Sequence, residues 1–165
     1  MANTFTLIAS YTVGSGGAAS IDFSSIPATY TDLCVKTSLR CSTADNIYIK
    51  LNNSSASFNV KFLYGSGSAA ASGGQADAYV GTANASTYTA NSFGSAELYI
   101  PNYAGSTNKS ISSDSVQETN ATTAYAVLAA SLWSNTAAIN QVTLSPNGGV
   151  FVEHSTAYLY GVSNA

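Results

Sequence analysis

The chain has 165 residues, of which only 8% are charged, and its formal net charge at pH 7 is −3. An average soluble domain contains about 25% charged residues, so hydroxyl and amide side chains must fill much of this protein's surface. The five basic residues are scattered along the chain, which excludes a basic stripe that could follow a nucleic-acid backbone. A hydrophobic fraction of 45% is sufficient for a core, so we expect one folded domain over residues 1–165.

The first residues contain neither the basic nor the apolar segment of a secretory signal. No stretch approaches the about 20 consecutive apolar residues that a membrane-spanning helix needs. We therefore expect neither a membrane nor a nucleic acid among the partners of this protein.

Alternation of apolar and polar residues predicts half-buried strands in the first part of the chain. The pattern covers residues 5–13, a short run at 21–23, residues 32–41, residues 47–51 and residues 58–64. The turns between these runs are too short for the dozen or more residues of a parallel crossover, so we expect antiparallel pairing.

The middle of the chain is less regular. Residues 65–74 consist of Gly, Ser and Ala, have little side-chain bulk and are predicted to form a flexible loop. Strand patterns resume at residues 78–80 and 96–100. Residues 109–118 predict a polar strand whose two apolar residues are out of phase, which indicates a bulge or a sheet edge.

The segment 124–133 is apolar on both faces, and helix competes with strand there. Alanine and leucine favour a helix, whereas Tyr, Val, Trp and the all-β surroundings favour a strand that is covered on both sides; we predict the strand. A strand at 142–144 is followed by Asn147-Gly148, which indicates a hairpin whose return strand begins at Phe151. The last strand covers residues 157–160.

Nine or ten short strands without a helix are typical of an all-β, antiparallel β-sandwich, and a jelly-roll-like arrangement fits this number best.

The two cysteines, Cys34 and Cys41, lie in one extended segment. At about 3.3 Å per residue their Cα atoms would be about 23 Å apart, whereas a disulfide requires less than about 7 Å. We expect two free thiols; a disulfide between subunits is the alternative. The alternation directs Cys41 towards the core and Cys34 outward.

Few residues offer catalytic chemistry. His154 is the only imidazole, and its neighbours Glu153 and Ser155 would point to opposite faces of a strand. The acidic residues are single and dispersed, so the sequence indicates no carboxylate pair for glycoside hydrolysis. One His and two Cys do not complete a zinc site. We predict a non-enzymatic protein with no catalytic residue, no metal and no cofactor.

The most informative surface residues are aromatic. Tyr48, Tyr99, Tyr158 and Tyr160 fall on presumed outer faces, where they could cover a second layer, form a subunit interface or stack against a sugar. Trp133 joins them as a candidate interface residue because its strand has more apolar surface than one small sandwich needs.

Longer motifs lie at Ser25-Ile26-Pro27-Ala28-Thr29-Tyr30-Thr31-Asp32-Leu33, Glu97-Leu98-Tyr99-Ile100-Pro101-Asn102-Tyr103 and Ala157-Tyr158-Leu159-Tyr160-Gly161. Together with shorter stretches that lie between them, these motifs resemble small single-domain virion proteins of tailed bacteriophages over most of the chain. The resemblance implies a capsid decoration (cement) protein, or alternatively a tail-associated module that binds a receptor or a carbohydrate. It further implies synthesis in the cytoplasm of a host bacterium, location in the virion and partners among major capsid or tail proteins. A homo-oligomer is expected, and three-fold positions on icosahedral shells imply a trimer.

Overall fold

The computed structural model describes residues 4–43, 46–119 and 124–163, and within these ranges it contains twelve strands and no helix. Accordingly, no helix in the described ranges is long and apolar enough to cross a membrane. The strands are β1 Phe5–Thr12, β2 Ile21–Phe23, β3 Asp32–Leu39, β4 Asn46–Leu51, β5 Phe58–Gly65, β6 Ala70–Gln75, β7 Tyr79–Thr82, β8 Gly94–Ile100, β9 Lys109–Glu118, β10 Ala124–Trp133, β11 Val142–Pro146 and β12 Thr156–Val162.

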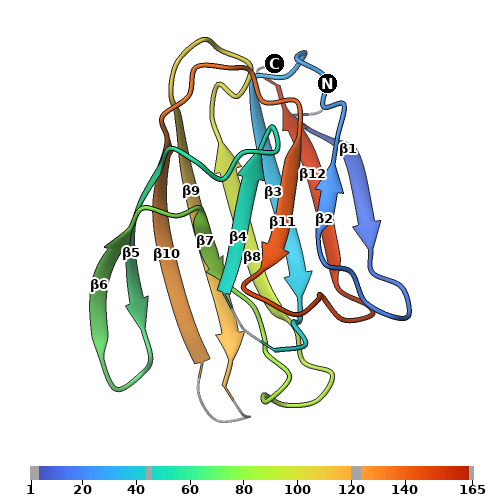
Figure 1. The fold of residues 1–165 in the computed structure, drawn as a ribbon, viewed down its shortest axis with the longest axis vertical. Helices are drawn as coiled ribbons and strands as arrows, with labels where there is room; N and C mark the ends of the chain where they lie inside the picture. Colours follow the sequence, from blue (N-terminus) through green and yellow to red (C-terminus); the bar gives the residue numbers. More distant parts are fainter. Residues whose placement is uncertain (1–3, 44–45, 120–123, 164–165) are drawn as a thin grey trace.

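The strands form two antiparallel sheets that pack as a sandwich, which confirms the predicted fold class. The larger sheet has the order β1-β12-β3-β8-β9-β10-β5-β6, and the smaller has the order β2-β11-β4-β7. Figure 1 shows the smaller sheet lying across the larger one, with β5 and β6 at one side and β1 at the other.

The strand order identifies an eight-strand framework with four added strands. Without β5, β6, β9 and β10, the remaining strands pair in a nested manner: β1 with β12, β2 with β11, β3 with β8, and β4 with β7. Such nesting, with the strands divided between two sheets, is the jelly-roll-like arrangement that the strand number indicated. The four added strands stand together at one end of the larger sheet, and we call them the extension.

The core lies between the sheets and consists of the inward residues of each alternating run. Ile49 and Leu144 from the smaller sheet and Leu159 from the larger one are fully buried there. Trp133 at the end of β10 is only 1% exposed and stacks on Phe58 of β5, with 6.3 Å between ring centroids. Trp133 is therefore a core residue and not part of the surface on which it was expected.

Serine hydroxyls attach the edge of the smaller sheet to the extension. The edge strand β7 has backbone groups without a strand partner on one side. Ser113 Oγ donates to Val80 O (2.7 Å), Ser131 Oγ donates to Tyr79 O (3.3 Å), and the Thr82 amide donates to Ser115 Oγ (3.1 Å). These bonds satisfy a buried edge that would otherwise lack partners.

They also explain why the sequence pattern of β9 was misleading. The segment was expected to be bulged or at an edge, but it pairs without a register shift with β8 and β10 inside the sheet. Its inward positions carry serines because they bind β7, and the outward Val116 remains exposed. Polar residues on the inner face obscured the apolar alternation.

Two turn predictions are corrected. Residues 70–74 of the expected flexible loop belong to β6, which pairs with β5 through its backbone. Asn147-Gly148 does not join a hairpin, because β11 and β12 belong to different sheets. Phe151 forms isolated bridges with Ala18 and Cys41 and does not begin a strand. β6 forms a hairpin with the preceding strand, whereas Phe151 takes its conformation from distant segments, which local turn preferences do not describe.

Candidate functional site

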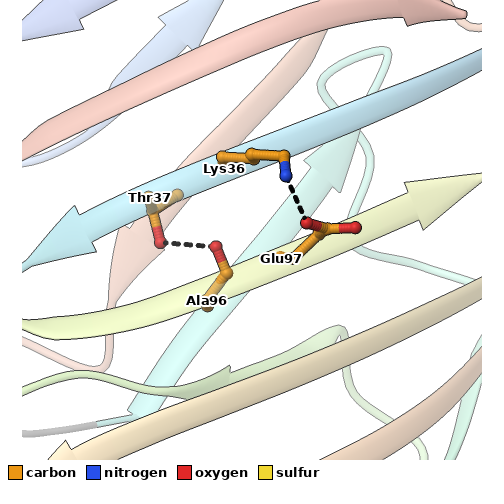
Figure 2. A network of polar contacts seen from close by, with 4 residues as sticks. All are labelled: Lys36, Thr37, Ala96 and Glu97. Atoms are coloured by element: carbon orange, nitrogen blue, oxygen red, sulfur yellow. Dashed lines mark hydrogen bonds and ion pairs between the residues drawn. The ribbon is translucent and has the colours of Figure 1, made fainter.

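The outer face of the larger sheet carries a mixed row of side chains across six strands. Directly opposed residues of an antiparallel pair point to the same face. The register places Tyr158, Lys36, Glu97, Asp114, Leu128 and Leu63 side by side, in this order. Lys36 Nζ lies 2.7 Å from Glu97 Oε2, and Figure 2 shows this pair joining β3 and β8. Charged groups therefore occupy the middle of the face.

Apolar side chains gather on the outer face of the extension. Leu63 and Leu128 oppose each other across β5 and β10, and both are 58% exposed. Leu132 and Val116 extend the same surface along β10 and β9 and are also exposed. We call these four residues the outer patch. It borders a shallow groove of about 490 Å³ that includes Ala130. Thus β10 is apolar on both faces, as predicted, but its outer face is not covered.

Three of the expected interface tyrosines lie on the same outer face, nearer β1. Tyr99 and Tyr160 flank Cys34 in the register, and Tyr158 is the most exposed of the three. Tyr99 donates a hydrogen bond from its hydroxyl to Asp32 Oδ2 at 2.6 Å, which with burial raises the pKa of Tyr99 to about 12. These tyrosines are therefore partly engaged within the sheet.

Cys34 points to the outer face, as the alternation predicts, but it is not exposed. It is fully buried, because Tyr99 and Tyr160 flank it on the neighbouring strands. Burial, together with the Glu97 carboxylate, raises the pKa of Cys34 to about 11. Cys41 lies in the core as expected, and neither cysteine forms a disulfide.

Tyr48 leads to a second surface. Its ring lies edge-on to Tyr79, with 6.1 Å between centroids, and so belongs to a separate cluster beside the extension. This cluster lies where the inner face of the extension continues past β7, the edge of the smaller sheet. A cleft of about 410 Å³ opens there, and we call it the aromatic cleft.

The aromatic cleft is lined by five rings. They are Phe62 and Tyr64 of β5, Tyr79 of β7, Tyr88 of the segment after β7 and Tyr125 of β10. Tyr64 and Tyr125 are nearly parallel, with centroids 5.4 Å apart, while Phe62 meets Tyr79 edge-on at 5.5 Å. Tyr79 is buried, and the other four are half-buried, so they keep part of their surface open.

The polar lining consists of amides and hydroxyls. It includes Asn46, Gln75, Thr82, Gln117 and Thr119. No Asp, Glu, Lys, Arg or His is found among the described residues that line the cleft. The cleft therefore offers hydrogen-bond donors and acceptors beside aromatic rings, without net charge.

The structure does not bring the Ser, His and acidic residues near position 154 into a catalytic arrangement. Ser155 Oγ accepts from the Arg40 amide (3.1 Å) and donates to Arg40 O (3.2 Å), so this buried hydroxyl serves the backbone. His154 is exposed in a turn with a φ of 70°. Across the part of the chain that the structure describes, no three His, Cys, Asp or Glu side chains are grouped to hold a metal ion.

Sequence reasoning missed the residues that form the aromatic cleft. Phe62 and Tyr64 share one face of their strand, as the alternation over residues 58–64 indicates, but the alternation alone does not identify them as part of a site. Tyr125 lies 61 positions further along the chain than Tyr64, and only strand pairing places the two rings together. One sequence signal could have indicated the cleft, namely the concentration of aromatic residues on the inner faces of strands that are bordered by Gly and Ser.

Comparisons with known proteins add no functional assignment. No family model matches the chain, and neither the search of curated proteins nor that of solved structures found a match.

Proposed function

We propose that the protein is a non-enzymatic structural protein of a tailed-phage virion and that it serves as a capsid decoration (cement) protein. The observation that supports this proposal best is the outer patch on the extension. Leu63, Val116, Leu128 and Leu132 lie on one broad face and are 38–58% exposed. The resemblance to small virion proteins supplies the particle as the assembly into which this face would fit.

The physical reason is the cost of leaving these side chains in water. Full burial of a leucine or valine side chain contributes about 1.5–3 kcal/mol. Exposed apolar patches with polar surroundings mark protein interfaces on soluble proteins. The serines of β9 and the Lys36–Glu97 pair provide such surroundings here. With few charges, attachment depends on shape and hydrogen bonds, so moderate salt should release little protein from particles.

We further propose a homo-oligomer, and specifically a trimer seated at three-fold positions of the shell, with the major capsid protein as partner. Oligomers with closed symmetry use the same patch on every copy. Sedimentation at micromolar concentration tests the trimer: a stable monomer would contradict it. Tyr99, Tyr158 and Tyr160 lie on the same broad face and are the residues we expect at its margin.

Counting copies in purified particles tests the decoration role. Hundreds of copies on the head agree with it, whereas roughly six to a few dozen at the tail contradict it. The variant Leu128→Asp places a charge in the outer patch and should reduce incorporation at least about tenfold. Lys50→Asp, at an exposed position of the smaller sheet, is the matched control. Equal incorporation of both variants would refute the role of the outer patch.

The aromatic cleft favours a second candidate, a tail-associated module that binds a receptor or carbohydrate. Its rings and amides lie away from the outer patch, on the inner face of the extension. A low copy number at the tail would support this candidate.

A further inference from the structure

The aromatic cleft combines ring surfaces with uncharged polar groups. From this combination we infer that it binds a neutral carbohydrate, with a short run of hexose units as the ligand class. The inference deepens the tail-associated candidate and rests on that candidate alone. Assembly through the outer patch is a separate property, measured by a separate experiment.

The rings match the apolar faces of a sugar. A pyranose ring presents C–H groups on its faces and hydroxyls around its rim, so its face packs against an aromatic side chain. Phe62, Tyr64, Tyr88 and Tyr125 line the cleft and are half-buried. The nearly parallel Tyr64 and Tyr125 hold each other in place, and β5 and β10 position them on a paired sheet. Such rings lose little side-chain freedom when a ligand packs on them.

The polar residues match the rim of a sugar. Gln75, Gln117 and Asn46 carry amides that both donate and accept hydrogen bonds, and Thr82 and Thr119 add hydroxyls. Small-molecule sites typically combine aromatic walls with a few such groups that fix orientation. The volume of about 410 Å³ falls within the about 300–1,000 Å³ of these sites.

The absence of charge distinguishes a neutral sugar from other ligands that stack on aromatic rings. Single-stranded nucleic acids also stack on tyrosines, but their phosphates require Lys or Arg beside the rings. The described lining residues include neither, and the same reasoning disfavours acidic sugars. A purely apolar ligand would remove the amides from water without giving them partners.

The test is a titration of ¹⁵N-labelled protein with neutral trisaccharides, namely cellotriose, maltotriose, mannotriose and N-acetylchitotriose, each to about 10 mM, a range suited to millimolar affinity. Trigalacturonic acid and a thymidine tetranucleotide serve as charged probes. We expect at least one neutral trisaccharide to shift the backbone amides of cleft residues such as Tyr64, Gln117 and Tyr125 in a saturable manner. Neither charged probe should do so.

Tyr64→Ala and Tyr125→Ala should each weaken that binding about tenfold, because each removes one stacking surface. Tyr158→Ala removes a tyrosine from the outer face of the same sheet and should leave binding unchanged. Gln75→Ala, a truncation at a half-buried position, provides a milder cleft variant if either tyrosine variant unfolds. The inference is overturned if no neutral trisaccharide binds, if the shifted amides centre outside the cleft, or if Tyr158→Ala weakens binding as much as the cleft variants.

Discussion

Arg40 is the residue whose replacement should destabilise this protein most clearly. Its side chain is 9% exposed, and its guanidinium donates to four backbone carbonyls and to the Ser92 hydroxyl of the segment after β7. Nη1 reaches Thr89 O (2.7 Å) and Ser92 O (3.0 Å), and Nη2 reaches Tyr88 O (3.2 Å) and Ser86 O (3.3 Å). One side chain therefore holds a whole loop, including the ring of Tyr88 in the aromatic cleft. Arg40→Met keeps the apolar stem and removes every donor.

The loss can be bounded from these contacts. Hydrogen bonds from a charged donor contribute about 1.5–3 kcal/mol each to the free energy of unfolding. If all four carbonyls lost their donor and found no water in its place, the loss would be about 6–12 kcal/mol. Most residues of this loop are exposed, so water can replace much of what the guanidinium supplied. Methionine also avoids the desolvation of a charged group. We therefore expect the free energy of unfolding to fall by about 3 kcal/mol, a large part of the about 5–15 kcal/mol of a typical domain.

Thermal unfolding measures this change. For a chain of this size, 1 kcal/mol shifts Tm by about 2–4 °C, so Arg40→Met should lower Tm by about 6–12 °C. Fluorescence of the single, buried Trp133 and circular dichroism provide two independent signals. The Tm of Arg40→Lys should lie between that of the unchanged protein and that of Arg40→Met, because one ammonium cannot reach four carbonyls.

The control is Lys50→Met, which replaces an exposed cation on β4. A decrease of less than about 3 °C for Arg40→Met would refute the reasoning, as would an equal decrease for Lys50→Met. Hydrogen exchange provides a local check. In Arg40→Met, the backbone amides of residues 86–92 should lose protection from exchange while the amides of the strands keep theirs.

Three further predictions follow from buried contacts. Ser113→Ala should lower the free energy of unfolding, measured by urea denaturation, by about 1–2 kcal/mol, because Val80 O loses its 2.7 Å hydrogen-bond donor. Ser112→Ala on the outer face should change it little, and equal effects of the two variants would contradict the role of Ser113 at the β7 edge. Gly73→Val should lower the free energy of unfolding by about 1–3 kcal/mol and disturb the aromatic cleft, because a Cβ at this position would lie 2.5 Å from the Phe62 ring. Ser72→Val is the control, and an unchanged Tm of Gly73→Val would show that the Phe62 ring moves aside freely. Burial raises the pKa of Cys34 from 9.0 to about 11, so the folded state holds that proton more tightly than the unfolded chain does. The stability from Cys34 is complete below pH 9.0 and is lost as pH rises to about 11, and Cys34→Ala should flatten this part of a stability–pH curve; an unchanged slope would refute the assignment.

The strands themselves could be predicted from the sequence, because strand alternation depends on neighbouring residues. Residues 124–133 illustrate this: Val127, Ala129, Ser131 and Trp133 are buried, while the alternate residues Leu128, Ala130 and Leu132 are exposed. The pattern of this strand also indicated more apolar surface than one small sandwich needs, but the cover expected on both faces is not found in the described part of the chain, and the outer face on the extension is exposed. That Cys34 and Cys41 form no disulfide with each other followed in the same way from the reach of an extended chain.

The partners of most strands could not be predicted, because strands pair through backbone groups that every residue shares. The Gly- and Ser-rich residues 70–75 carry no apolar pattern, yet they form β6 and pair with β5, the strand just before them in the chain. Cys34 has the alternation of an exposed residue, but Tyr99 and Tyr160 from two other strands flank and bury it.

The candidate site depends on the same long-range pairing. The sequence by itself determined an all-β chain with few charges, an excess of apolar surface and many tyrosines. Only the tertiary structure decided that four strands extend one sheet beyond the other, and that Tyr64 and Tyr125 meet on the inner face of this extension. Alternation is a local consequence of backbone geometry, whereas a cleft exists only where strands distant in sequence lie side by side.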